Sequence, residues 1–214
     1  PLTYHYAGLE IGKCGPWSQG PVQLQTLALL NEMGVADWNP VSTDFVHGVT
    51  EALKLAFADR EAYYGDPDFV KVPLKQLLSS EYNRERSKEI SNQASLELRP
   101  GKISGFEVRM PEFDSSGRGD ERFSAMGIGE PTVSKKGETR GDTCHLDVVD
   151  RWGNMVSATP SGGWLQSSPV IPELGFCLNS RAQMFWLQEG LPATLAPGKR
   201  PRTTLTPSMA LRDG

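Results

Sequence analysis

The hydrophobic pattern of this chain changes its period at Thr143, and this change constrains the fold more than any other feature. Up to about residue 90, apolar residues recur at the spacing of roughly 3.6 residues that is typical of amphipathic helices. From Thr143 they alternate as in a half-buried strand, with Cys144, Leu146 and Val148 on one face. A turn is expected at 152–154, after which residues 155–159 resume the strand pattern. Because helices come first and strands follow, the order predicts an α+β or layered architecture.

Helices are expected over four stretches of the first part of the chain. The pattern places them near residues 21–34, from residue 42 or 44 to 64, near 74–78 and near 81–90. The twenty residues before them are rich in turn formers. Residues 1–90 are therefore predicted to be a mainly helical part.

Residues 91–142 lose this pattern and are rich in Gly, Ser, Pro and charged residues. A structureless segment of such length inside a compact domain is usually functional or disordered. Strand-like stretches begin again at residue 143 and continue to 214, with a short helix expected over 181–188 and a last strand over 207–212. The predicted division is therefore 1–90, a flexible 91–142, and a strand-rich 143–214.

Composition excludes several classes of protein. The 22 basic and 26 acidic residues give a net charge of −4, which leaves no footprint for nucleic acid. No apolar run approaches the roughly 20 residues that a membrane span requires. The chain has no initiator Met, so its true start is expected to be missing and its localisation stays unknown. Cys14, Cys144 and Cys177 cannot all pair, and the last two lie in apolar runs that predict buried, inert thiols.

Other motifs carry little information. Arg118–Asp120 and Arg140–Asp142 are RGD tripeptides, which are short enough to arise by chance. None of the three histidines has the spacing of a metal site, so neither a metal nor another cofactor is expected. Cys144 and His145 are neighbours on a strand and point to opposite faces, so they cannot form a nucleophile–base pair.

The junction at Thr143 has two interpretations. Pattern alone favours an ordinary β-hairpin that follows a loop. Alternatively, cleavage after Asp142 would make Thr143 a chain end, whose hydroxyl attacks while its free α-amino group accepts the proton. An α-amino group has an unperturbed pKa of about 7.7–8.0, which suits a base at neutral pH.

Several long motifs resemble those of the γ-glutamyltransferase family of N-terminal nucleophile hydrolases. They appear in the family's order along most of the chain. The motifs are "GPWSQGP", "EALKLAFADREAYYGDPDFVKVP", "RPGKI", "DTCHLDVVDRWGNMVSAT" and "PGKRPRTTLTPSMALRDG".

The resemblance implies an αββα four-layer sandwich made as one precursor. The precursor would cut itself between Asp142 and Thr143 into a large and a small subunit. Thr143 then corresponds to the nucleophile, and Ser161 to the family's second threonine, whose hydroxyl supports the nucleophile. Thr203 and Thr204 correspond to a pair of serines that hold the substrate's α-carboxylate.

Three positions depart from the family pattern. Gly163 replaces an asparagine, Arg181 a glutamine, and Met184 the aspartate that contacts the substrate's α-amino group. A thioether cannot pair with a buried ammonium, and an arginine repels it but attracts a carboxylate. These departures favour a glutaryl-type acyl group over a γ-glutamyl one.

The function expected from the resemblance is an autoprocessing amidohydrolase or acyltransferase. An acyl-threonine intermediate would form from a γ-glutamyl or glutaryl-like amide, glutathione among the candidates, and pass to water or an amine. The alternative is a non-catalytic binding homologue of the same fold. Trp164 and Trp186 either line the pocket or pack in the core, which is the commoner fate of large aromatics.

The remaining parts of both subunits are the other expected partners. By resemblance, an arginine that clamps the substrate lies upstream, and the glycine pair of the oxyanion hole lies beyond Gly214. We therefore expect the isolated fragment to be inactive, since each lost oxyanion donor typically costs about 10²–10³ in rate.

Overall fold

The computed structural model describes residues 1–112, 143–161 and 169–212. It divides into two compact units, which are described separately. The first unit joins Pro1–Met110 to Met184–Gly214, and the second is Pro111–Gln183. Helices and antiparallel strands occupy separate stretches of the sequence, which confirms the α+β class.

The helices of the first unit follow the predicted pattern closely. Ser42 caps the longest one, its Oγ accepting a hydrogen bond from Phe45 N over 3.2 Å, and Ser79 caps another in the same way from Tyr82 N over 3.3 Å. Pro21 stands at the start of the first helix, where a missing N–H costs nothing. The elements are α1 (Gly20–Glu32), the 3₁₀ turn η1 (Val35–Asp37), α2 (Thr43–Tyr63), α3 (Leu74–Leu77) and α4 (Ser80–Ser87).

The first twenty residues differ from the prediction of a turn-rich start. Two strands, β1 (Leu2–Tyr6) and β2 (Leu9–Lys13), form a hairpin there. Ala7 and Gly8 link them with φ of 50° and 77°, the positive pair that a tight two-residue hairpin requires. Strand β7 (Ser208–Leu211) pairs antiparallel with β2, so the sheet order is β1-β2-β7.

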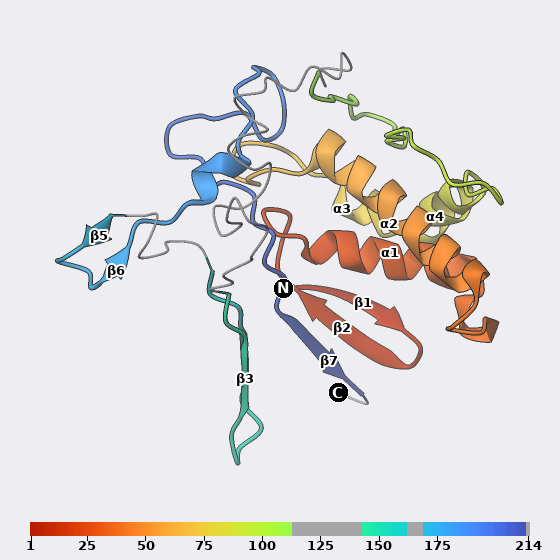
Figure 1. Cartoon of the computed structure of the whole chain (residues 1–214), viewed down its shortest axis with the longest axis horizontal. Coiled ribbons are helices and arrows are strands. Elements are labelled where there is room, and N and C mark those ends of the chain that lie inside the picture. The colour runs from red at the N-terminus through yellow and green to blue at the C-terminus, as the bar shows by residue number, and fades with distance from the viewer. Residues whose placement is uncertain (113–142, 162–168, 213–214) are drawn as a thin grey trace, which may run out of the picture. The chain divides into compact units, whose positions relative to one another are not determined.

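The core of this unit lies around α1. Figure 1 shows α1 between the three-stranded sheet and the helix α2, and α1 also contacts α4. Burying this interface removes a large apolar area from water, which is the main stabilising contribution. The core side chains come from α1, α2 and the segments beside them: Val22, Leu29, Leu30, Val35, Ala52, Leu55, Ala56, Ala62, Tyr63, Tyr64, Leu77 and Ile103.

A buried carboxylate fastens the stretch after α4 to these helices. Asp59 is fully buried and accepts hydrogen bonds from Gln25 Nε2 at 2.6 Å, Tyr82 OH at 2.8 Å and Gly101 N at 2.7 Å. Burial raises the pKa of Asp59, and the cationic Arg86 nearby lowers it. Residues 91–112 form no helix or strand, yet this carboxylate holds their central part against the helical layer.

The second unit contains short antiparallel pairs. Strand β3 (Leu146–Val149) pairs with β4 (Met155–Ala158), and β5 (Val170–Ile171) with β6 (Phe176–Cys177). The turn between β3 and β4 follows the expected position, with Gly153 at φ 84°. The helix expected over 181–188 is only a 3₁₀ turn, η2 (Arg181–Met184). Trp186 and Thr194 instead form a backbone bridge.

The cysteines and the lengths of the helices bear on two further features of the described residues. The thiols of Cys14, Cys144 and Cys177 are unpaired, but Cys144 is exposed rather than buried and Cys177 is half-buried, so the prediction of buried thiols is wrong. No helix in the described ranges combines the length and apolar character needed to cross a bilayer.

Candidate functional site

Two hydroxyl groups meet beside the β3–β4 hairpin. Thr143 precedes β3 and Ser161 follows β4, and their Oγ atoms lie 2.7 Å apart. The antiparallel register of the hairpin places them opposite each other, and the bond from Cys144 N to Pro160 O at 3.1 Å continues that register toward the pair. The closure of a local hairpin therefore brings together residues that are 18 positions apart.

A guanidinium group completes this cluster. Arg181 Nη2 lies 3.2 Å from Ser161 Oγ, and Arg181 is buried, with only 4% of its surface exposed. The Arg181 backbone N–H donates to Asn179 Oδ1 at 2.6 Å, which fixes the start of η2. The three side chains Thr143, Ser161 and Arg181 thus form one hydrogen-bonded chain within the second unit.

The chemistry of the donors sets the direction of this chain. A guanidinium only donates, so Ser161 Oγ accepts from Arg181 and retains its own proton. Of the described groups that bond to Ser161 Oγ, only Thr143 Oγ1 has a lone pair to receive that proton. In this arrangement Thr143 Oγ1 accepts from Ser161, and its own proton is free to pass to a base.

The polar face of the hairpin continues below this pair. His145 Nδ1 lies 2.7 Å from Thr159 Oγ1, and its Nε2 lies 2.9 Å from Asp147 Oδ2. The sequence interpretation considered His145 as a metal ligand and as a partner of Cys144, and it overlooked these contacts. The spacing of these residues could have indicated the contacts, because in extended backbone residues 143, 145 and 147 point to the same face.

Thr203 and Thr204 belong to the first unit, where cations fasten the loop that carries them. Arg200 forms a bidentate ion pair with the buried Asp66, at 2.6 and 3.1 Å. Its guanidinium carbon also lies over the ring of Trp17, 5.3 Å from the ring centroid. The hydrogen bonds from Arg200 hold the pKa of Asp66 well below its usual range.

Further contacts fix the same loop on both sides of the two threonines. Arg202 Nη2 donates to Glu61 Oε2 at 2.9 Å, and Thr203 N donates to Trp17 O at 2.6 Å. Lys13 Nζ donates to Thr206 O at 2.7 Å and also contacts Ser208 Oγ. The backbone that carries the two threonines is therefore held on both sides, and Thr203 Oγ1 itself accepts a hydrogen bond from Leu205 N at 3.1 Å.

The remaining residues singled out in the sequence have different outcomes. Asp142, Gly163 and Trp164 lie outside the described residues. Met184 is half-buried at the end of η2. Trp186 is half-buried in the first unit and donates from Nε1 to Glu61 Oε2 at 3.2 Å. In the described part of the chain, no group of three or more His, Cys, Asp or Glu side chains could hold a metal ion.

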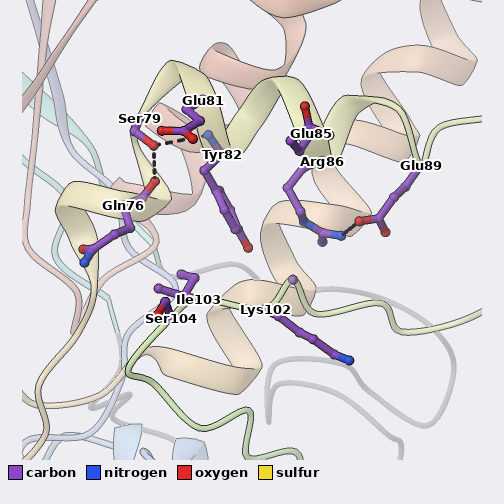
Figure 2. Close-up of a pocket in the computed structure, with 11 residues that line it drawn as sticks. Gln76, Ser79, Glu81, Tyr82, Glu85, Arg86, Glu89, Lys102, Ile103 and Ser104 are labelled. Atoms are coloured by element: carbon purple, nitrogen blue, oxygen red, sulfur yellow. Dashed lines mark hydrogen bonds and ion pairs between the residues drawn. The ribbon is translucent and has the colours of Figure 1, made fainter.

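A separate pocket of about 440 Å³ lies between α4 and residues 101–104 (Figure 2). Its one buried cation is already engaged. Arg86 pairs with Glu89 at 2.6 Å, donates to Arg99 O at 2.6 Å and reaches Asp59 at 3.5 Å. These contacts attach the segment 99–103 to the helices, so we assign the pocket to structure and not to catalysis.

Comparison with known proteins adds to this geometry. The family model described as gamma-glutamyltranspeptidase matches residues 1–214. The Acylase ACY 1 proenzyme of Pseudomonas sp. (strain SE83) is 33% identical, and the glutathione hydrolase proenzyme of Bacillus subtilis subsp. natto is 30% identical, each over the whole chain. The chain spans 33% and 34% of these two proteins, about a third of their length.

A solved structure is also similar to this chain. LmbA2991T421A is 54% identical to this chain and superimposes with a TM-score of 0.77. The match covers 100% of this chain and 34% of that protein. The similarity to this solved structure, like the match to the family model, therefore extends over the whole of this chain.

Proposed function

This chain belongs to the gamma-glutamyltranspeptidase family, and on that premise we propose that it is part of an autoprocessing amidohydrolase or acyltransferase. The proposed nucleophile is the hydroxyl of Thr143, released as a chain end by cleavage after Asp142. The proposed fold of the complete protein is the αββα sandwich of N-terminal nucleophile hydrolases. Both relatives compared above are described as proenzymes, which supports a maturation step.

The observation that carries the proposal is the 2.7 Å contact between Thr143 Oγ1 and Ser161 Oγ. Nucleophile and supporting hydroxyl lie within hydrogen-bond reach before any cleavage. In the proposed self-cleavage, Thr143 Oγ1 attacks the carbonyl carbon of Asp142, the C–N bond breaks, and an ester forms. Water then hydrolyses the ester and leaves a carboxylate on Asp142 and a free amino group on Thr143.

The same atoms serve the proposed turnover. The freed α-amino group takes the Thr143 hydroxyl proton while Oγ1 attacks the substrate's amide carbonyl. The amine leaves with a proton, and an acyl-threonine ester remains. Water as acceptor completes hydrolysis, and an amine as acceptor completes transfer. Ser161, donating to Oγ1, stabilises the charge that develops there.

For the acyl donor we propose a glutaryl-type amide in preference to a γ-glutamyl amide. Arg181 lies one hydroxyl away from the nucleophile, so a substrate ammonium near Thr143 meets a positive charge. Met184 offers that ammonium no carboxylate. Thr203 and Thr204, on their fixed loop, are proposed to hold the carboxylate of the substrate.

The second candidate is a non-catalytic binding homologue. It is favoured by the departures at Gly163, Arg181 and Met184 from the family pattern. The paired hydroxyls of Thr143 and Ser161 oppose it, since a binding module gains nothing from them.

Steady-state kinetics of the full-length protein test the substrate proposal. Glutaryl-p-nitroanilide and γ-glutamyl-p-nitroanilide differ only in the α-amino group, so the ratio of their kcat/KM values isolates its effect. We expect the glutaryl compound to be the better substrate. A clear preference for the γ-glutamyl compound would overturn the glutaryl assignment, and no turnover of either by a protein that also stays uncleaved would favour the binding homologue.

A further inference from the structure

The ladder of backbone hydrogen bonds between β3 and β4 ends before it reaches Thr143 and Ser161. Its last pair is Leu146 with Ala158. Beyond that pair, Cys144 N donates to Pro160 O at 3.1 Å, but proline has no N–H to return a bond. Between this last pair and Ser161, the two sides of the hairpin are therefore joined by one backbone hydrogen bond in place of the usual two.

A side-chain contact lies at the same level. His145 and Thr159 come between the last ladder pair and the pair Thr143–Ser161, and the two side chains are 2.7 Å apart. Cross-strand pairs of this kind stabilise a sheet locally and hold its register. In the described part of the hairpin, this contact and the single Cys144 bond are the cross-strand hydrogen bonds between the ladder and the reactive hydroxyls.

Asp147 orients the ring for this contact. Its Oδ2 lies 2.9 Å from His145 Nε2 and, as a carboxylate, can only accept, so Nε2 carries a proton. In a neutral ring Nδ1 then has a lone pair and accepts the hydroxyl proton of Thr159. Both nitrogens of the ring are thereby engaged, and successive residues on one face of a strand are about 6.6 Å apart along it. His145 is therefore not placed as a direct base for Thr143.

We propose that His145 is a positioning residue for the nucleophile. Its Nδ1 contact with Thr159 replaces the backbone bond that Pro160 cannot make and keeps Ser161 Oγ opposite Thr143 Oγ1. This role rests on the proposed function and adds three residues to it: His145, Asp147 and Thr159.

The design of the test uses the two ring nitrogens separately. An asparagine amide reaches about as far as Nδ1, and a glutamine amide about as far as Nε2. In the full-length precursor, His145→Asn should retain the contact with Thr159 and self-cleave at close to the wild-type rate. His145→Gln, His145→Ala and Thr159→Val should each slow self-cleavage by about tenfold, the scale expected when reacting groups shift by a fraction of an ångström.

Two further readouts separate positioning from a general loss of fold. Cys144→Ser is the matched control and should cleave normally, because it changes an exposed, unpaired thiol next to His145 and leaves the backbone N–H in place. In the mature enzyme the loss should fall on kcat with KM little changed. The double variant His145→Ala/Thr159→Val should be no slower than either single variant, because both remove the same contact.

Each outcome decides the proposal. Wild-type rates in His145→Ala and His145→Gln would overturn it, and so would rescue by glutamine but not by asparagine. If His145→Ala fails to fold, the comparison of asparagine with glutamine still decides. A wild-type precursor that never cleaves would overturn the proposed function itself, and this role with it.

Discussion

Arg181 donates a hydrogen bond to Ser161 across 3.2 Å, and Ser161 in turn contacts Thr143, the proposed nucleophile. Resemblance alone placed Arg181 among the groups that bind substrate. The structure adds a second consequence of the Arg181 charge. Because the guanidinium donates to Ser161 Oγ, it favours donation of the Ser161 proton toward Thr143. Charge at position 181 can thus affect both the nucleophile and the choice of acyl group.

Removing the supporting hydroxyl should slow chemistry. Ser161→Ala deletes the donor to Thr143 Oγ1, and a hydrogen bond to a developing charge is worth about 1.5–3 kcal/mol. We expect self-cleavage of the full-length precursor to slow by about tenfold to a hundredfold, measured by the appearance of the smaller fragment on gels. Ser161→Thr keeps the hydroxyl and should cleave like the wild type. Equal rates in all three proteins would contradict the role of Ser161.

Changing the charge at position 181 should shift substrate choice. Arg181→Gln removes the cation that opposes a substrate ammonium, so the ratio of kcat/KM for γ-glutamyl over glutaryl anilide should rise by about tenfold, as for a charge pair screened near the protein surface. Arg181→Lys retains the charge and should leave the ratio near that of the wild type. An unchanged ratio in Arg181→Gln would show that Arg181 does not select the acyl group.

The ion pair between Asp66 and Arg200 should make stability depend on pH. The pKa of Asp66 is lowered in the folded state, so its ionised form stabilises the fold fully above the unfolded value of about 3.9. This contribution is lost as the pH falls toward the folded pKa. Asp66→Asn should therefore lower Tm at pH 7, and the difference from the wild type should shrink below about pH 4.

Asp68 provides the matched control for this measurement. It contacts the same Arg200 at 2.7 Å, but its side chain is 75% exposed whereas that of Asp66 is 1% exposed. Exposed ion pairs contribute little, so Asp68→Asn should change Tm much less. Equal losses in both variants, or a loss that does not vary with pH, would contradict the assignment.

The close approach at Gly101 should be intolerant of a side chain. A Cβ there would meet Tyr82 OH at 2.1 Å and Arg86 Cδ at 2.8 Å, both of which belong to the network around Asp59. Gly101→Ala should lower the free energy of unfolding by about 1–3 kcal/mol, as overpacking does. Gly12→Ala, where the nearest atoms lie at 3.8 Å, is the control and should be nearly neutral. Chemical denaturation of both variants measures the difference.

The sequence predicted the helices well because their signals are local. In α2, the apolar period and the cap at Ser42 lie within the segment itself. The β1–β2 hairpin was missed because a count of turn residues concealed the alternation on either side of Ala7 and Gly8. A closer look at that alternating pattern would have found it.

The candidate site was predictable only in part. Resemblance pointed to Thr143 and Ser161, and the hairpin register explains why they meet. The contact of Arg181 with Ser161 joins residues 20 positions apart and follows no periodicity. Anchoring of the Thr203 loop by Asp66 and Glu61 spans still more of the chain, so it depends on tertiary packing that no local pattern encodes.

The most direct test of the central claim is the intact mass of the full-length protein under denaturing conditions, after purification and incubation. Self-cleavage predicts two fragments whose masses sum to that of the precursor plus one water, with Thr143 at the start of the smaller one. Thr143→Ala should remain a single chain. A wild-type chain that also remains uncut would contradict the claim, because Thr143 would never gain the free amino group on which the mechanism depends.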